Sequence, residues 1–253
     1  MTALLEAEGL SKHFGGIQAL REVSLSVAEG ELVGLIGPNG AGKTTLFDCL
    51  LGEVDPDAGS VHLGGTRIDR LRPHARARLG IGRTFQRLEL FSGLTTREHV
   101  LLAIRVRDRT VSLWRDLVGL GRASPAEQRE ADDLLGLTGL VEVAELPVEA
   151  LGLGHGRLVE LARALASAPR LLLLDEPSSG LDGTERDDLA RLLQEIRRVR
   201  RIAVLLVEHD LDMVAAAAER LVVLDAGRVI ADGPPSEVLA DPAVREAYLG
   251  TGP

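Results

Sequence analysis

The stretch GPNGAGKTT, residues 37–45, combines glycines, a lysine and hydroxyl side chains at a spacing that suits phosphate binding. Gly37, Gly42, Lys43 and Thr44 fit the pattern G-x-x-x-x-G-K-[ST] without a mismatch. In this pattern, backbone N–H groups surround a phosphate, the lysine reaches the outer phosphates and the hydroxyl ligates Mg²⁺. The sequence therefore predicts a site for a nucleoside triphosphate and Mg²⁺. The predicted phosphate-binding residues are Gly37, Pro38, Asn39, Gly40, Ala41, Gly42, Lys43, Thr44 and Thr45.

A pair of carboxylates follows the apolar run LLLL, residues 171–174. Such a run predicts a buried parallel strand. At its carboxyl end, Asp175 is placed to hold Mg²⁺ through water, and Glu176 is placed to polarise an attacking water. Taken alone, the pair also fits a helix cap or a solvated strand end. With a phosphate-binding loop upstream, we interpret the pair as a hydrolytic centre.

Two further polar residues fit the same chemistry. His209 follows the apolar run IAVLLV, residues 202–207, at the strand edge where α/β folds bind ligands, and it could donate to a γ-phosphate oxygen. It also fits a surface position at the start of the next helix. Gln86 could orient water or contact Mg²⁺ through its amide, although an isolated glutamine is usually a surface residue.

The sequence lacks the element that recognises guanine, which narrows the choice of nucleotide base. Guanine-specific proteins of this class read the base with an Asn-Lys-x-Asp element, and Asn39 is the only asparagine. Phe14, ahead of a short Gly-Gly loop, could stack on adenine or belong to the core.

A second glycine-rich stretch, EALGLGHGRLVELARALA, spans residues 149–166. Apolar residues recur at helical spacing from Arg157 onward, so the stretch is predicted to be a loop that leads into a helix. Gly152, Gly154 and Gly156 expose backbone N–H groups there, which is typical of an anion site.

Composition excludes several classes of protein. A net charge of −9 and an aromatic content of 2% argue against nucleic-acid binding. No apolar run approaches the roughly 20 residues that span a bilayer. The N-terminus lacks the basic residues of an export signal, and Cys49, as the only cysteine, fits a reducing compartment.

Short apolar runs and turn residues predict the elements that position these groups. A strand over 31–36 and a helix over 44–52 flank the phosphate loop. The runs at 4–10, 23–27 and 60–65 predict antiparallel strands, and 221–233 predicts a hairpin.

In this order, the motifs resemble the ATP-binding subunit of ABC transporters along almost the whole chain. The resemblance identifies residues 37–45 as the P-loop, Gln86 as the Q-loop glutamine, Asp175 and Glu176 as the Walker B pair, and His209 as the switch histidine. It places Phe14 on adenine. The D-loop residues that it implies are Ser179, Gly180, Leu181 and Asp182.

The second glycine-rich stretch falls where this family carries its signature, usually Leu-Ser-Gly-Gly-Gln. In the family this loop contacts the γ-phosphate held by a second subunit. Here the loop consists of Leu151, Gly152, Leu153, Gly154 and His155. The missing serine hydroxyl would have added about 1.5–3 kcal/mol. We therefore expect a weakened site, which is most easily reconciled with a heterodimer.

The resemblance implies an α/β P-loop NTPase fold with an antiparallel β subdomain and a helical subdomain. Its predicted parts are residues 1–86 (β layer and P-loop core), 87–160 (helical subdomain), 161–232 (the rest of the core) and 233–253 (tail). It also implies ATP and Mg²⁺ as ligands and a peripheral location on the cytoplasmic face of the membrane. The implied partners are a second ATPase subunit, two permeases and an extracytoplasmic solute-binding protein, with no nucleic acid.

Within the family, residues 80–103 and the ending ADPAVREAYLG (240–250) look like ATPase subunits of branched-chain amino acid importers. Urea and amide importers share these features, and lipopolysaccharide-export ATPases share some of them. A soluble ABC ATPase of DNA repair or ribosomes usually has two cassettes or long coiled-coil insertions, which this chain lacks. An ATP-binding partner with weakened catalysis stays an alternative because of the altered signature.

Overall fold

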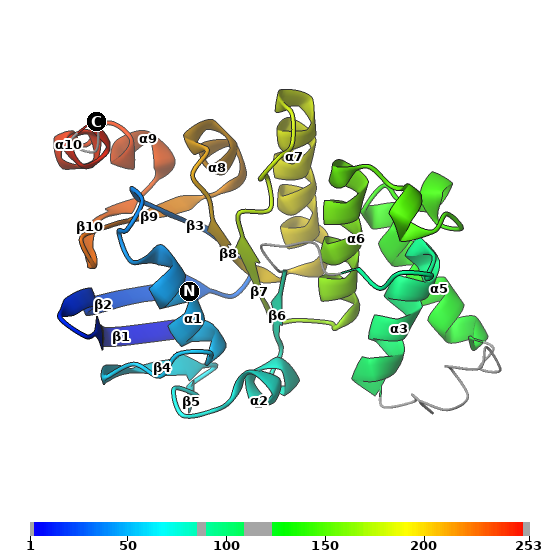
Figure 1. Cartoon of the computed structure of the whole chain (residues 1–253), viewed down its shortest axis with the longest axis horizontal. Helices are drawn as coiled ribbons and strands as arrows, with labels where there is room; N and C mark the ends of the chain where they lie inside the picture. Colours follow the sequence, from blue (N-terminus) through cyan, green and yellow to red (C-terminus); the bar gives the residue numbers. More distant parts are fainter. Residues whose placement is uncertain (1–2, 85–89, 109–122, 250–253) are drawn as a thin grey trace.

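The computed structural model describes residues 3–84, 90–108 and 123–249, which build two sheets and a group of helices (Figure 1). Gln86 lies outside these residues, so its predicted role stays a prediction. None of the described helices is long and apolar enough to cross a membrane.

The first sheet is four-stranded and antiparallel, with the strand order β2-β1-β4-β5. Its strands are β1 (Ala3–Phe14), β2 (Ile17–Ala28), β4 (Ala58–Leu63) and β5 (Thr66–Arg67). The three antiparallel strands predicted from alternating residues are confirmed, and β1 and β2 extend well beyond the predicted runs. A tight turn at Gly15 and Gly16 joins them, so Phe14 ends β1.

The second sheet has the strand order β10-β9-β3-β8-β7-β6 and carries the predicted hydrolytic centre. Its strands are β3 (Leu32–Ile36), β6 (Ile81–Arg83), β7 (Leu171–Asp175), β8 (Ala203–Val207), β9 (Arg220–Asp225) and β10 (Arg228–Gly233). The pairs β3–β8, β8–β7, β7–β6 and β3–β9 are parallel, whereas β9 and β10 form the predicted hairpin. The carboxyl ends of β3, β7 and β8 therefore meet at one edge.

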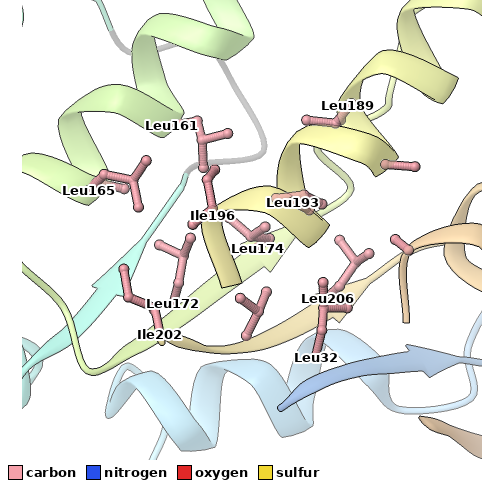
Figure 2. Close-up of a cluster of buried hydrophobic side chains, with 14 of the residues drawn as sticks. Leu32, Leu161, Leu165, Leu172, Leu174, Leu189, Leu193, Ile196, Ile202 and Leu206 are labelled. Carbon is pink, nitrogen blue, oxygen red and sulfur yellow. The ribbon is translucent and has the colours of Figure 1, made fainter. Parts of the chain in front are cut away.

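Alternate side chains of β7 are buried on opposite faces of the second sheet. Leu172 and Leu174 belong to one core cluster, with Leu161 of α6 and Leu193 of α7 (Figure 2). Leu171 and Leu173 belong to the other core cluster, beneath the first sheet. Full burial of each leucine contributes about 1.5–3 kcal/mol. Burial on both faces explains why this strand is a continuous apolar run rather than an alternating one.

The helices cover the second sheet and extend beyond its β6 edge (Figure 1). They are α1 (Lys43–Leu51), α2 (Pro73–Arg78), α3 (Thr96–Asp108), α5 (Pro125–Leu137), α6 (Leu153–Ala166), α7 (Gly183–Arg200), α8 (Leu211–Ala217), α9 (Pro235–Val238) and α10 (Pro242–Leu249). Helices α3 and α5 pack on each other and on α6. Ser124 and Glu127 form a capping box that starts α5.

The helix of the second glycine-rich stretch begins earlier than its sequence pattern indicated. The prediction placed a glycine loop before Arg157, but α6 starts at Leu153 with Gly152 as its N-cap. Gly154 and Gly156 therefore lie in the first turns of the helix. The apolar periodicity becomes visible only after the glycines, which explains the late predicted start. The four-part division of the chain stays a prediction, and α6 crosses its boundary at residue 160.

Candidate functional site

The phosphate loop turns sharply between β3 and α1, and glycine is required at both ends of the turn. Gly37 has φ +150°, and a Cβ there would lie 2.0 Å from the Leu224 carbonyl oxygen. Gly42 has φ +104°, and a Cβ there would lie 2.5 Å from the Ala19 carbonyl oxygen. Gly42 is also the N-cap of α1, and among the described residues no side chain caps the first N–H groups of this helix. The loop thus presents free backbone donors and a helix N-terminus to an anion.

Lys43 places its ammonium inside this loop. Its Nζ donates to the carbonyl oxygens of Gly37 at 2.6 Å and Pro38 at 3.0 Å. Burial lowers the pKa of Lys43, while the carboxylates of Glu176 and Asp175 oppose this shift. The P-loop lysine and the predicted hydrolytic pair are therefore electrostatic neighbours, as the sequence motifs predicted.

The opposite end of α1 is held by an arginine that no sequence motif identified. Arg76 of α2 is 1% exposed. Its guanidinium donates to the carbonyl oxygens of Cys49 at 2.6 Å and Leu50 at 2.8 Å, and also to those of Leu71 and Asp69. A buried cation at a helix C-terminus donates hydrogen bonds to the last carbonyl groups and interacts favourably with the negative end of the helix dipole. This contact fixes α1, and with it the phosphate loop.

Asp175 and Glu176 lie at the carboxyl end of β7, as predicted. Burial raises the pKa of Asp175 to about 6, and nearby negative charges add to the effect. Those charges belong to Glu176, Asp48 and Glu208. So many carboxylates at one strand edge make a bound cation favourable there.

Glu176 has a strained backbone. Its φ of +45° lies in the left-handed region, which costs a non-glycine residue about 1–3 kcal/mol. The conformation is held by hydrogen bonds from Glu176 N–H to the Val207 carbonyl at 2.9 Å and from Ser179 N–H to the Glu176 carbonyl at 3.1 Å. Strain of this kind clusters at active sites, because it points a side chain in a direction that regular backbone cannot.

His209 follows β8 and faces the same carboxylate. Its Nδ1 lies 3.8 Å from Oε2 of Glu176, and the ring is largely exposed. The next helix, α8, starts two residues later with Asp210 as its N-cap. The structure therefore brings Lys43, Asp175, Glu176 and His209 to one edge of the sheet.

Glu208 is a site residue that sequence reasoning missed. It directly follows the apolar run of residues 202–207, and its side chain is completely buried between β8 and the turn after β7. A carboxylate directly after a buried strand was the available signal.

The predicted D-loop and signature loop pack on each other. A Cβ on Gly180 would lie 2.5 Å from Cδ2 of Leu153, and one on Gly154 would lie 2.4 Å from Oε1 of Glu185. Glu185 and Asp182 form the capping box that starts α7. The first turns of α6 and α7 are therefore held as one unit.

The signature loop does not reach the phosphate loop of its own chain. Helices α1 and α6 lie far apart in the molecule, with β8 and β7 between them (Figure 1). Gly152 and His155 are exposed, and Gly152 has ordinary extended angles, φ −70° and ψ 168°. Within the part of the chain that the structure describes, no side chain caps α6, and the first turn of this helix carries no acidic residue. This second helix N-terminus faces outward with free donors.

Phe14 stands apart from the carboxylates, at the tip of the first sheet. The ring is 48% exposed, and Lys12 Nζ lies 5.5 Å from its centroid. Lys12 is itself fixed by Asp57 Oδ1 at 2.9 Å and by the Asp55 carbonyl at 2.7 Å. This exposure argues against a core position, and stacking on adenine stays a prediction.

The residues present fit a nucleoside triphosphate with Mg²⁺. The loop has room only for backbone at Gly37 and Gly42, and Thr44 in the first turn of α1 is exposed. Among the described residues, no group of three His, Cys, Asp or Glu side chains could hold a metal by itself. Mg²⁺ in such sites relies on one or two protein ligands, phosphates and water.

Comparison with known proteins adds independent findings. The family model described as "ABC transporter" matches residues 20–179, and the one described as "Branched-chain amino acid ATP-binding cassette transporter" matches residues 228–253. The chain is 40% identical to the high-affinity branched-chain amino acid transport ATP-binding protein BraF of Pseudomonas aeruginosa, over 98% of both chains. It is 37% identical to the lipopolysaccharide export system ATP-binding protein LptB of Escherichia coli, over 98% of both chains.

Comparison with solved structures identifies the same kind of protein, the ATP-binding cassette. An ATP-binding cassette of an ABC transporter in its ADP conformation superposes with a TM-score of 0.86 at 30% identity, covering 99% of this chain and 100% of that one. A dimeric ATP-binding cassette in a post-hydrolysis state, bound to ADP and phosphate, superposes with a TM-score of 0.75 at 26% identity. The match covers 91% of this chain and 98% of that one. The predicted P-loop fold with an antiparallel sheet is confirmed.

Proposed function

The chain belongs to the ABC transporter ATP-binding family, whose members hydrolyse ATP, and we propose that it powers the import of branched-chain amino acids. The observation that carries this proposal is the match at the end of the chain. Residues 228–253 fit the tail of the branched-chain amino acid cassette family, whereas residues 20–179 fit the broader family. The near full-length likeness to BraF supports the same substrate class.

We assign ATP hydrolysis to the edge formed by β3, β7 and β8. Lys43 and the backbone of residues 37–45 bind the phosphates, and Phe14 stacks on adenine. Glu176 accepts a proton from the water that attacks the γ-phosphorus, and the β–γ bond breaks to release ADP. His209, 3.8 Å from Glu176, donates to the γ-phosphate and keeps that carboxylate oriented.

Thr44 and Asp175 would hold Mg²⁺, with Gln86 as a further predicted ligand. The bound ion neutralises phosphate charge during transfer. The raised pKa of Asp175, about 6, supports this assignment because an added cation relieves the crowding of negative charge.

We propose that two such ATPase subunits pair and that each signature loop, residues 151–155, completes the partner's site. The outward-facing start of α6 supports this arrangement, since it cannot serve the P-loop of its own chain. The D-loop residues Ser179, Gly180, Leu181 and Asp182 would lie at the same interface, because they pack on the signature loop. Two permeases, an extracytoplasmic solute-binding protein and a position on the cytoplasmic membrane face complete the proposed assembly.

Two alternatives rest on particular observations. The likeness to LptB favours export of lipopolysaccharide, and it is almost as high as the likeness to BraF. The altered signature, with Gly152 and His155, favours a partner that binds ATP but hydrolyses it slowly. Import of urea or amides is a third possibility that the sequence resemblance left open.

Reconstitution in vesicles tests the proposal. The chain is co-expressed with the permeases and any second ATPase encoded beside it, and uptake of labelled leucine, urea and a control amine is measured with internal ATP. We expect ATP-dependent leucine uptake, which falls at least about a hundredfold with Glu176→Gln and stays unchanged with the exposed control Glu195→Gln. Uptake of urea alone, or no uptake by a complex that hydrolyses ATP, would overturn the substrate assignment.

A further inference from the structure

Glu208 is a buried carboxylate that the proposed chemistry does not use. It follows β8 directly, and its side chain is 0% exposed. Among the residues that the structure describes, His209 is the only basic side chain within 4 Å of the Glu208 carboxylate, with Nδ1 3.9 Å from Oε2. A buried charge with so weak a partner is unfavourable unless hydrogen bonds compensate for the lost water.

Two backbone donors supply that compensation, one for each carboxylate oxygen. Ser178 N–H donates to Oε1 at 2.9 Å, and His209 N–H donates to Oε2 at 3.3 Å. Ser178 belongs to the turn after β7, and His209 follows β8. One side chain therefore connects the ends of two neighbouring strands, just beyond the point where their ladder of hydrogen bonds stops.

The Ser178 contact supports the strained backbone of Glu176. Glu176 is held on one side by its own N–H, which donates to the Val207 carbonyl at 2.9 Å. On the other side the chain continues through Pro177, which has no N–H, so Ser178 carries the next available donor. Its bond to Glu208 anchors the turn directly after Glu176, whose φ is +45°.

The His209 contact acts on the other predicted catalytic group. Glu208 receives the backbone N–H of His209, and the His209 ring lies 3.8 Å from the Glu176 carboxylate. The Glu208 carboxylate thus holds both the backbone of His209 and the turn after Glu176. A shift of the Glu208 side chain would displace both groups together.

We propose that Glu208 is a positioning residue for ATP hydrolysis, which sets the distance and direction between Glu176 and His209. This inference rests on the proposed roles of those two residues. The arrangement needs a carboxylate, because two donors approach two separate oxygens. A glutamine offers one acceptor oxygen and would face the second donor with an NH₂ group, and a leucine offers none.

The test compares Glu208→Gln and Glu208→Leu with the wild type in the intact chain, assembled with the partner subunits with which it purifies. Glu31→Gln serves as the control, because Glu31 is also a largely buried carboxylate that accepts a backbone N–H, from Ala28 at 2.7 Å, and it precedes the amino end of β3, opposite the site. ATPase kcat and KM, binding of a fluorescent ATP analogue and the melting temperature are measured for each.

We expect kcat to fall about tenfold in Glu208→Gln and about a hundredfold in Glu208→Leu, because misplacement near 1 Å has effects of that size. Analogue affinity should stay within about twofold, since the P-loop is untouched, and Glu31→Gln should keep the wild-type kcat. The inference is overturned if kcat per folded molecule is unchanged, or if both variants lose affinity and kcat together. Should Glu176→Gln itself hydrolyse normally, the proposed function fails first, and the two failures are thereby distinguished.

Discussion

The molecule contains two glycine-rich helix N-termini, and they are built differently. At α1 the loop closes on itself: its glycines have positive φ, Lys43 lies inside it, and Gly42 packs against the Ala19 carbonyl. At α6 the loop is open: Gly152 has extended angles, nothing lies within 4 Å of a Cβ there, and the cap makes no side-chain contact. Both ends offer free N–H groups and a positive dipole. This difference supports our proposal that the closed loop binds phosphate within its own chain, whereas the open loop contributes to a site shared with a second chain.

The largest expected effect comes from breaking the support of α1. Arg76→Met leaves four carbonyl oxygens without their donor, two of them at the C-terminal end of α1. We expect the free energy of unfolding to fall by about 3–5 kcal/mol, the usual cost of leaving buried polar groups unpaired in such a network.

Urea unfolding followed by circular dichroism measures this loss. Arg78→Met on the exposed face of the same helix is the matched control and should change stability by less than about 0.5 kcal/mol. Equal stability of the two variants would mean that α1 does not depend on the arginine.

The second-largest effect is expected when the positive charge inside the closed loop is removed. Lys43→Ala takes away the ammonium inside the P-loop and should weaken ATP binding about a hundredfold, because hydrogen bonds to charged groups contribute about 1.5–3 kcal/mol each. Calorimetric titration of the isolated chain with ATP and Mg²⁺ measures it. Lys12→Ala, which changes the only other lysine, should have a much smaller effect. Unchanged affinity in Lys43→Ala would contradict the P-loop assignment.

The closed loop was predictable from sequence, whereas much of the open one was not. The motif around Lys43 and the apolar runs before Asp175 and His209 are local signals, so strand, loop and helix followed from residue order. The start of α6 was predicted four residues late, because glycines conceal a helical period. The buried positions of Arg76 and Glu208 depend on residues far along the chain. Gly34 is similar: a Cβ there would lie 2.5 Å from Val214, a contact that no local pattern reveals.

A third effect concerns the negative edge that faces the closed loop. Asp175 has a pKa of about 6 in the fold, against about 3.9 in an unfolded chain. The folded chain therefore holds the proton more tightly. The stability that the protonated Asp175 carboxyl contributes to the folded state is therefore complete below about pH 4. It is lost as the pH rises to about 6.

In EDTA and without nucleotide, the free energy of unfolding should thus decrease between pH 4 and 7 by about 2 kcal/mol more in the wild type than in Asp175→Asn, after allowing for the partial exposure of this carboxyl. Asp133→Asn, at an exposed position of α5, should retain the wild-type slope. Parallel pH profiles for wild type and Asp175→Asn would show that burial does not shift this group.

The smallest effect restores what the open loop lacks. Gly152 has φ −70° and ψ 168°, angles that serine adopts freely, and a Cβ there meets no atom within 4 Å. Serine therefore fits without strain, and its hydroxyl could donate to a γ-phosphate of the partner. Part of the 1.5–3 kcal/mol of such a bond should return, which corresponds to about tenfold tighter ATP-driven dimerisation. Gly136→Ser, at an exposed and unobstructed helix position of α5, is the matched control.

Sedimentation of the Glu176→Gln chain, with and without Gly152→Ser, tests the shared-site account most directly. It is run with ATP and Mg²⁺, alone and with any partner ATPase encoded beside it. The account predicts that the added serine tightens association about tenfold, while ATP affinity of the monomer stays the same and Gly136→Ser changes neither. Unchanged association would contradict the claim that the start of α6 contacts the partner's phosphate through position 152. A change in monomer affinity would place the loop at its own nucleotide.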